Sequence, residues 1–153
     1  MSRCVLVFLS GLMVLAAVAC SSDSNPVAPT NPGGSNSVTT LRITDTRVGT
    51  GAEAVNGRLI TVNYTGWLYD ENAVANKGAQ FDTSLQPGRG PYPFTLGART
   101  VIAGWDQGLV GMRVGGLRNL VIPASMAYGS QGSGSSIPAN AALVFDVELL
   151  SVQ

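Results

Sequence analysis

Helical periodicity in this chain of 153 residues is confined to one short stretch, and that stretch contains two glycines. Apolar residues recur there at the spacing of one helix face and predict a helix around residues 103–110: Ile102, Trp105, Leu109 and Met112. Gly104 and Gly108 lie within it, and each glycine costs a helix up to about 1 kcal/mol relative to alanine. A helix this short must therefore be held in place by packing against other elements.

Strand patterns fill much of the chain after residue 40. Residues 143–149 alternate cleanly, with apolar side chains on one face and with Asp146 and Glu148, which we expect to be solvated, on the other. Further strands are predicted at residues 58–68 and 117–122, with shorter candidates at 41–48 and 80–83. Strands do not alternate with long helices, which argues against a parallel βαβ design. The pattern predicts an α+β domain, an antiparallel sheet packed on one short helix.

The composition excludes several kinds of chemistry. The chain contains no histidine, and its two cysteines, Cys4 and Cys20, both lie near its start. A Ser-His-Asp triad, a histidine or thiolate metal site, a thiol nucleophile and a disulfide are therefore excluded from the rest of the chain. The formal net charge is zero and only 12% of residues are charged, so nucleic acid is not an expected partner. We expect no metal and no cofactor.

The start of the chain reads as an export signal followed by a tether. Arg3, an apolar run and a small-residue cleavage site predict a signal peptide over residues 1–19. Cys20 follows directly and resembles the cysteine of a bacterial lipoprotein signal, which implies a lipid anchor at Cys20 and a membrane-anchored protein that faces the periplasm. Ordinary cleavage at the same bond, which would release a soluble protein, is the alternative. Residues 20–40 then form a predicted disordered tether, rich in Ser, Asn, Pro and Gly, ahead of a domain at 41–153.

Six short segments follow one another through this domain. They are VNYTG at 62–66, FDTS at 81–84, FTLG at 94–97, VIAGW at 101–105, AYG at 127–129, and IP at 137–138 leading to LVFDVEL at 143–149. In this order they resemble the FKBP-type peptidyl-prolyl cis/trans isomerases. The resemblance covers nearly all of residues 41–153 and implies a five- or six-stranded antiparallel sheet curled around the short helix.

The resemblance also implies a hydrophobic cleft between the helix and the sheet. Trp105 forms its floor, Asp82 and Tyr128 are polar residues at its rim, and Ile137 closes its loop side. Its walls are Tyr64, Phe81, Phe94, Val101, Ile102 and Phe145. Without the resemblance, Trp105 reads first as a core residue and Asp82 as a surface or turn carboxylate.

The implied activity is rotation about Xaa-Pro peptide bonds. Resonance opposes that rotation with a barrier of about 18–20 kcal/mol, and no covalent bond has to form or break. A dry aromatic cleft favours the less polar, twisted amide over the planar one. The family implies that the Ile102 N–H and the Tyr128 hydroxyl hold substrate carbonyls, and that Asp82 hydrogen-bonds to the substrate or fixes Tyr64.

Two loops depart from the simplest form of this family. Ser136 stands where an aliphatic residue is common, and residues 129–136 are small and polar, so this loop is expected to contact substrate less tightly. Residues 69–79 form a longer connection that could overhang the cleft. An active isomerase that assists the folding of exported proteins, bound through their Xaa-Pro segments, is the main hypothesis. A binding or chaperone module with little turnover, and a membrane scaffold, are the alternatives. A monomer is expected.

Overall fold

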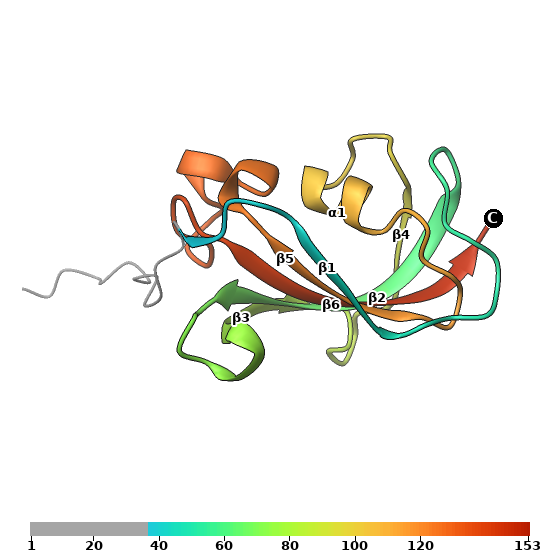
Figure 1. Cartoon of the computed structure of the whole chain (residues 1–153), viewed down its shortest axis with the longest axis horizontal. Coiled ribbons are helices and arrows are strands. Elements are labelled where there is room, and N and C mark those ends of the chain that lie inside the picture. Colours follow the sequence, from blue (N-terminus) through green and yellow to red (C-terminus); the bar gives the residue numbers. More distant parts are fainter. Residues whose placement is uncertain (1–36) are drawn as a thin grey trace, which may run out of the picture.

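A six-stranded antiparallel sheet wraps around one short helix in the computed structural model, which describes residues 37–153 (Figure 1). The predicted α+β architecture, an antiparallel sheet on a single helix, is therefore confirmed. The predicted signal peptide, Cys20 and most of the tether lie outside the described residues. No helix among residues 37–153 is long and apolar enough to cross a membrane. The strands are β1 (Arg42–Arg47), β2 (Leu59–Tyr69), β3 (Lys77–Thr83), β4 (Tyr92–Thr95), β5 (Leu117–Ile122) and β6 (Leu143–Val152), and the helix is α1 (Ala103–Gly108).

Strand β2 organises the part of the sheet that carries the cleft. The sheet order is β1-β5-β6-β2-β3, and β4 also pairs with β2. β4 lies against the first half of β2, at Leu59–Val62, whereas β3 lies against its second half, at Thr65–Tyr69. Because β6 occupies the other edge of β2, β3 and β4 share one edge, and the chain between them must leave the sheet. This detour, residues 84–91, lies beside the cleft.

The helix is pressed against β5 through its two glycines. A Cβ added to Gly104 would lie 2.4 Å from Cγ2 of Ile122, and one added to Gly108 would lie 2.9 Å from Cδ2 of Leu120. Glycine is thus required here by the close approach of helix and sheet, although it weakens the isolated helix. The helix ends at Gly108, a little before the predicted end at residue 110, because Leu109 already serves as its C-cap.

Two strand predictions need correction, and one strand was not predicted. β4 (YPFT) is the strand without a prediction; it is short and contains proline, which is tolerated on a sheet edge. β3 starts at Lys77 rather than at residue 80, so the predicted 69–79 loop is shorter. Gly and Ala have low strand propensity, and pairing with β2 determines the strand here. β6 continues to Val152, beyond the predicted end at residue 149.

The face of the sheet away from the helix carries a second, smaller apolar cluster. Val38 is only 4% exposed and packs with Tyr69, Val121, Ala142 and Val144. Side chains alternate along a strand, so Val144 lies on the opposite face from its cleft-lining neighbour Phe145. The packed chain therefore starts ahead of the predicted boundary at residue 41.

Asp146 and Glu148 face away from the core, as the alternation predicts, but they are not freely solvated. Asp146 accepts hydrogen bonds from Lys77 at 2.5 Å and from Asn119 at 2.8 Å. Glu148 pairs with Arg47 at 2.6 Å. These pairs connect different strands on the outer face of the sheet. The sequence alone could not assign them, because the partners lie far apart in the chain.

Candidate active site

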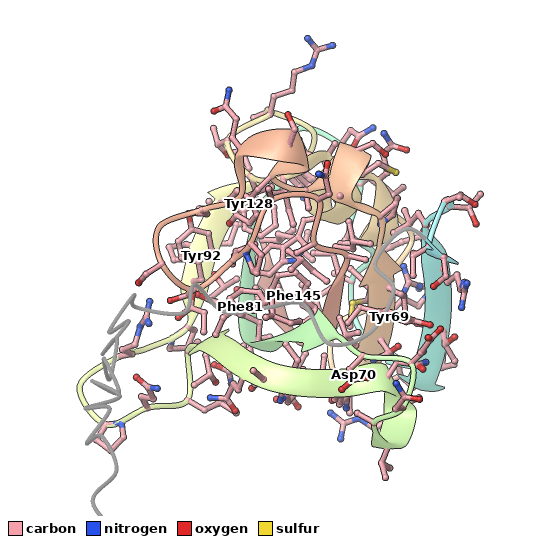
Figure 2. The ribbon with its side chains drawn as sticks, turned by 90° about the vertical axis from the view of Figure 1, so that its left-hand side faces the viewer. Tyr69, Asp70, Phe81, Tyr92, Tyr128 and Phe145 are labelled. Carbon is pink, nitrogen blue, oxygen red and sulfur yellow. The ribbon has the colours of Figure 1, made fainter. Side chains whose placement is uncertain are left out.

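A cleft of about 670 Å³ opens between the start of α1 and strands β2, β3, β4 and β6. Figure 2 looks onto this side, with Tyr128 above, Tyr92 to the left and Phe81 and Phe145 below. The cleft is lined by Tyr64, Phe81, Asp82, Arg89, Tyr92, Arg99, Thr100, Val101, Ile102, Ala103, Trp105, Ala127, Tyr128 and Phe145. Eight of the ten residues predicted for the cleft line it: Tyr64, Phe81, Asp82, Val101, Ile102, Trp105, Tyr128 and Phe145.

The Trp105 side chain is held by apolar packing, in which other aromatic rings take a large part. It is 5% exposed, and its ring centroid lies 5.1 Å from that of Tyr64 and 5.3 Å from that of Phe145, both in edge-to-face geometry. Its indole Nε1 is buried without a hydrogen-bond partner in the described part of the chain. Edge-to-face pairs of this kind stabilise beyond simple burial, by about 0.5–1.5 kcal/mol. The indole thus forms a rigid apolar surface.

Gly66 of β2 makes room for the two phenylalanines of the cleft. A Cβ at Gly66 would lie 2.7 Å from both Phe81 and Phe145, whose rings pack edge to face with centroids 5.6 Å apart. A side chain here would displace one ring or the other. The glycine in the VNYTG segment therefore serves the aromatic wall and not a turn.

The polar side of the cleft is a hydrogen-bonded network around Asp82. The Tyr64 hydroxyl donates to Asp82 at 2.6 Å, and Arg89 donates to its other carboxylate oxygen at 2.5 Å. The backbone N–H of Thr83 donates to Asp82 at 2.9 Å. Burial, and then the hydrogen bond to Asp82, raise the pKa of Tyr64 well above its ordinary value. Tyr64 therefore stays protonated, and Asp82 acts as an anchor for Tyr64 and Arg89.

Two potential hydrogen-bond donors face the cleft without partners. The Tyr128 hydroxyl makes no hydrogen bond with any of residues 37–153, and burial followed by the charge of Asp82 raises its pKa, which keeps it protonated. The N–H of Ile102 is likewise unused in the described chain, because Ile102 is the extended N-cap of α1, where only its carbonyl enters the helix. A cleft with an apolar floor and two free donors in its lining suits a ligand that carries carbonyl oxygens.

Asp106 holds the loop that leads to Ile102. Its side chain is 9% exposed, and it accepts the backbone N–H of Gly97 at 2.8 Å and that of Arg99 at 2.9 Å. Both carboxylate oxygens are thereby occupied. This contact ties residues 97–99 to the helix and so fixes one wall of the cleft.

Phe94 and Ile137 do not line the cleft, in contrast to the prediction. Phe94 is 5% exposed and lies against Trp105, with ring centroids 5.6 Å apart, so it supports the floor from within the core. Ile137 is 6% exposed in the core and is joined to Ser133 by backbone hydrogen bonds in both directions. Residues 69–79 also contribute nothing to the cleft wall, and Figure 2 shows Tyr69 and Asp70 well away from it.

Sequence reasoning missed several residues of the cleft. Tyr92 takes the place expected for Phe94: both side chains share a face of β4, and Tyr92 is the more exposed, at 42%. That spacing of two residues was the available signal. The other missed residues are Arg89, Arg99, Thr100, Ala103 and Ala127. Among residues 37–153, no group of three or more His, Cys, Asp or Glu side chains is placed to hold a metal ion.

Known proteins are similar to this chain in sequence. An FK506-binding protein of Neisseria meningitidis serogroup A / serotype 4A is 52% identical over 112 residues, which cover 73% of this chain and 95% of the relative. An FK506-binding protein 2 of Candida glabrata is 48% identical over 100 residues, 65% of this chain and 68% of the relative.

Solved structures are similar to this chain in fold as well as in sequence. The crystal structure of AtFKBP13 matches with a TM-score of 0.63 and 39% identity, over 74% of this chain and 93% of that one. FkpA from Escherichia coli matches with a TM-score of 0.62 and 39% identity, over 75% of this chain and 49% of that one. The model of the family described as FKBP-type peptidyl-prolyl cis-trans isomerase matches residues 51–150. The aromatic cleft and these matches together place the chain in the family of FKBP-type peptidyl-prolyl cis-trans isomerases.

Proposed function

We propose that this peptidyl-prolyl isomerase acts on Xaa-Pro bonds of exported proteins as they fold, and that it does so as a monomer held at a membrane through a lipidated Cys20. The observation that carries the catalytic part is the cleft itself, with an aromatic floor and two unpartnered donors beside it. Slow Xaa-Pro isomerisation limits the folding of many chains, which gives an enzyme of this kind a task outside the cytoplasm.

The proposed mechanism stabilises the twisted amide. The proline ring stacks on Trp105, and the surrounding aromatic rings exclude water from the imide. The Ile102 N–H and the Tyr128 hydroxyl hold carbonyl oxygens on either side, so that one flank of the bond stays fixed while the other rotates. A planar amide is more polar than a twisted one, so an apolar cleft lowers the barrier of about 18–20 kcal/mol by favouring the transition state. No proton is transferred and no bond is broken.

Asp82 has a positioning role in this mechanism. Its two oxygens accept hydrogen bonds from Tyr64 and Arg89, which holds the Tyr64 ring edge-on to Trp105. Removal of the carboxylate frees both partners and loosens the wall of the cleft.

The test is catalysis of cis/trans exchange in short Xaa-Pro peptides by residues 21–153, measured by NMR exchange. Phe81→Ala removes an aromatic wall residue and should abolish most of the acceleration. Val74→Ala, a change at a side chain that is 92% exposed and does not line the cleft, is the matched control and should leave the rate unchanged. No acceleration by a folded wild-type domain would refute isomerisation and favour a binding module that uses the same cleft.

Anchoring at Cys20 rests on the sequence of the export signal and on the place where the tether meets the domain. Val38 is buried on the sheet face opposite the cleft, so a tether that ends there leaves the cleft open to clients. The tether predicted from the sequence of residues 20–40 would, as a random coil, have an r.m.s. reach of roughly 25 Å, enough to hold the domain clear of a bilayer. Cys20→Ser should move the protein from the membrane fraction to the soluble periplasmic fraction. Retention of this variant on membranes would refute the anchor.

A further inference from the structure

A second hollow adjoins the cleft at the loop before α1. It has a volume of about 390 Å³ and shares Arg99, Val101 and Ala103 with the cleft. Its remaining wall consists of Asn56, Gly97, Asp106 and Gln107. A peptide bound across Trp105 can therefore place a neighbouring side chain in this hollow, past Arg99.

Arg99 is held in an uncommon backbone conformation. Its φ of 59° lies in the left-handed region, which a residue other than glycine seldom adopts. The carboxylate of Asp106 accepts the Arg99 N–H at 2.9 Å and the Gly97 N–H at 2.8 Å, which fixes the loop in this shape. Such conformations persist only where the surroundings enforce them, and they gather at functional sites. Here the consequence is that Arg99 stands between the two hollows.

The guanidinium of Arg99 is free to bind a ligand. Within residues 37–153, Arg99 forms no ion pair and no side-chain hydrogen bond, unlike Arg47, Lys77, Arg89, Arg113 and Arg118, which pair with carboxylates. In the cleft, Asp82 is paired with Arg89, so Arg99 supplies the remaining charge.

Asp106 is the negatively charged residue of the second hollow, but its carboxylate forms no ion pair with the Arg99 guanidinium. Both of its oxygens accept backbone N–H groups, and it is largely buried beneath the loop. Asn56 and Gln107 add amide groups that can donate to a ligand oxygen. Of the two charged residues that line this hollow, Arg99 is therefore the one whose side chain is left to bind a ligand.

We propose that Arg99 and this hollow form a substrate subsite that selects an acidic side chain at a position flanking the Xaa-Pro pair. This inference rests on the isomerase function proposed above. A guanidinium binds a carboxylate through paired N–H donors, which a neutral amide cannot match. Because Arg99 is exposed, the preference is modest: exposed ion pairs correspond to discrimination of about two- to five-fold.

The test compares peptides in which Glu is moved through each position flanking one Xaa-Pro pair, each matched with a Gln peptide. The measured quantity is the ratio of kcat/KM for Glu to that for Gln with residues 21–153. We expect a ratio of about two to five at one position at low salt, falling towards one at roughly 0.5 M salt. A ratio near one at every position would overturn the subsite. No turnover of any peptide would instead overturn the isomerase function.

Variants assign the preference to Arg99. Arg99→Gln should bring the ratio to about one, Arg99→Glu should invert it, and Arg99→Lys should keep part of it. Arg42→Gln is the matched control, since Arg42 is also exposed and unpaired in the described chain but lies on β1, away from both hollows. A preference that survives Arg99→Gln, or that Arg42→Gln removes equally, would show that the overall charge of the domain is responsible and would overturn the proposal.

Discussion

Replacement of Gly104 by alanine tests whether the helix is held by contact with the sheet. The added methyl would meet three atoms of Ile122 at 2.4, 2.7 and 2.9 Å, and Ile122 is fully buried, so it has little room to move. Overpacking of this kind costs about 1–3 kcal/mol. Alanine also favours the helix over glycine by up to about 1 kcal/mol. The clash is expected to exceed that gain, with a net loss of up to about 2 kcal/mol in the free energy of unfolding.

A double-mutant cycle separates the two effects. Ile122→Ala removes all three of the atoms that the new methyl would meet, so Gly104→Ala should be neutral or stabilising in that background. Unfolding is followed by urea denaturation with tryptophan fluorescence. Gly90→Ala is the control, because a Cβ at Gly90 meets nothing within 4 Å. If Gly104→Ala stabilises the otherwise wild-type domain, or costs the same with and without Ile122→Ala, the close contact between α1 and β5 does not explain the glycine.

Three further predictions concern the cleft. Asp82→Ala and Tyr64→Phe should each lower kcat/KM. Because both changes remove the hydrogen bond between Tyr64 and Asp82, the double variant should lose less than the sum of the two single losses, and additive losses in peptide exchange would contradict this coupling. Tyr92→Leu should reduce kcat/KM with little loss of stability, since Tyr92 is 42% exposed. Phe94→Leu should mainly lower the unfolding midpoint, since Phe94 is 5% exposed. A reversed pattern in paired activity and denaturation measurements would show that the two positions are assigned wrongly. Because the pKa of Tyr64 is raised in the folded state, the stability that this residue contributes is complete below its ordinary pKa of 10.0 and is lost as pH rises above that value. Tyr64→Phe should therefore flatten the fall in the free energy of unfolding at alkaline pH. An unchanged pH profile would argue against this linkage.

Whether a cleft residue could be predicted from the sequence depended on whether it lies on a regular element or in a loop. Periodicity placed Trp105, Tyr64 and Phe145 on the apolar face of their predicted elements, and the family resemblance then assigned them to the cleft. Arg89 and Arg99 could not be predicted as cleft residues, because they lie in loops whose paths depend on contacts with Asp82 and Asp106. Phe94 was assigned to the cleft wall because its motif matched, but β4 carries it beneath Trp105 and leaves Tyr92 at the opening.

The sequence by itself determined the class of fold, the single helix, most of the strands and the aromatic character of the site, because these follow from local periodicity and residue chemistry. The tertiary structure decided how β3 and β4 divide one edge of β2, where the detour of residues 84–91 therefore runs, and which donors are left without partners. It also explains the glycines at positions 66 and 104, where neighbouring side chains leave no space for a Cβ. Pairing register and close packing depend on residues far apart in the chain, so no local pattern encodes them.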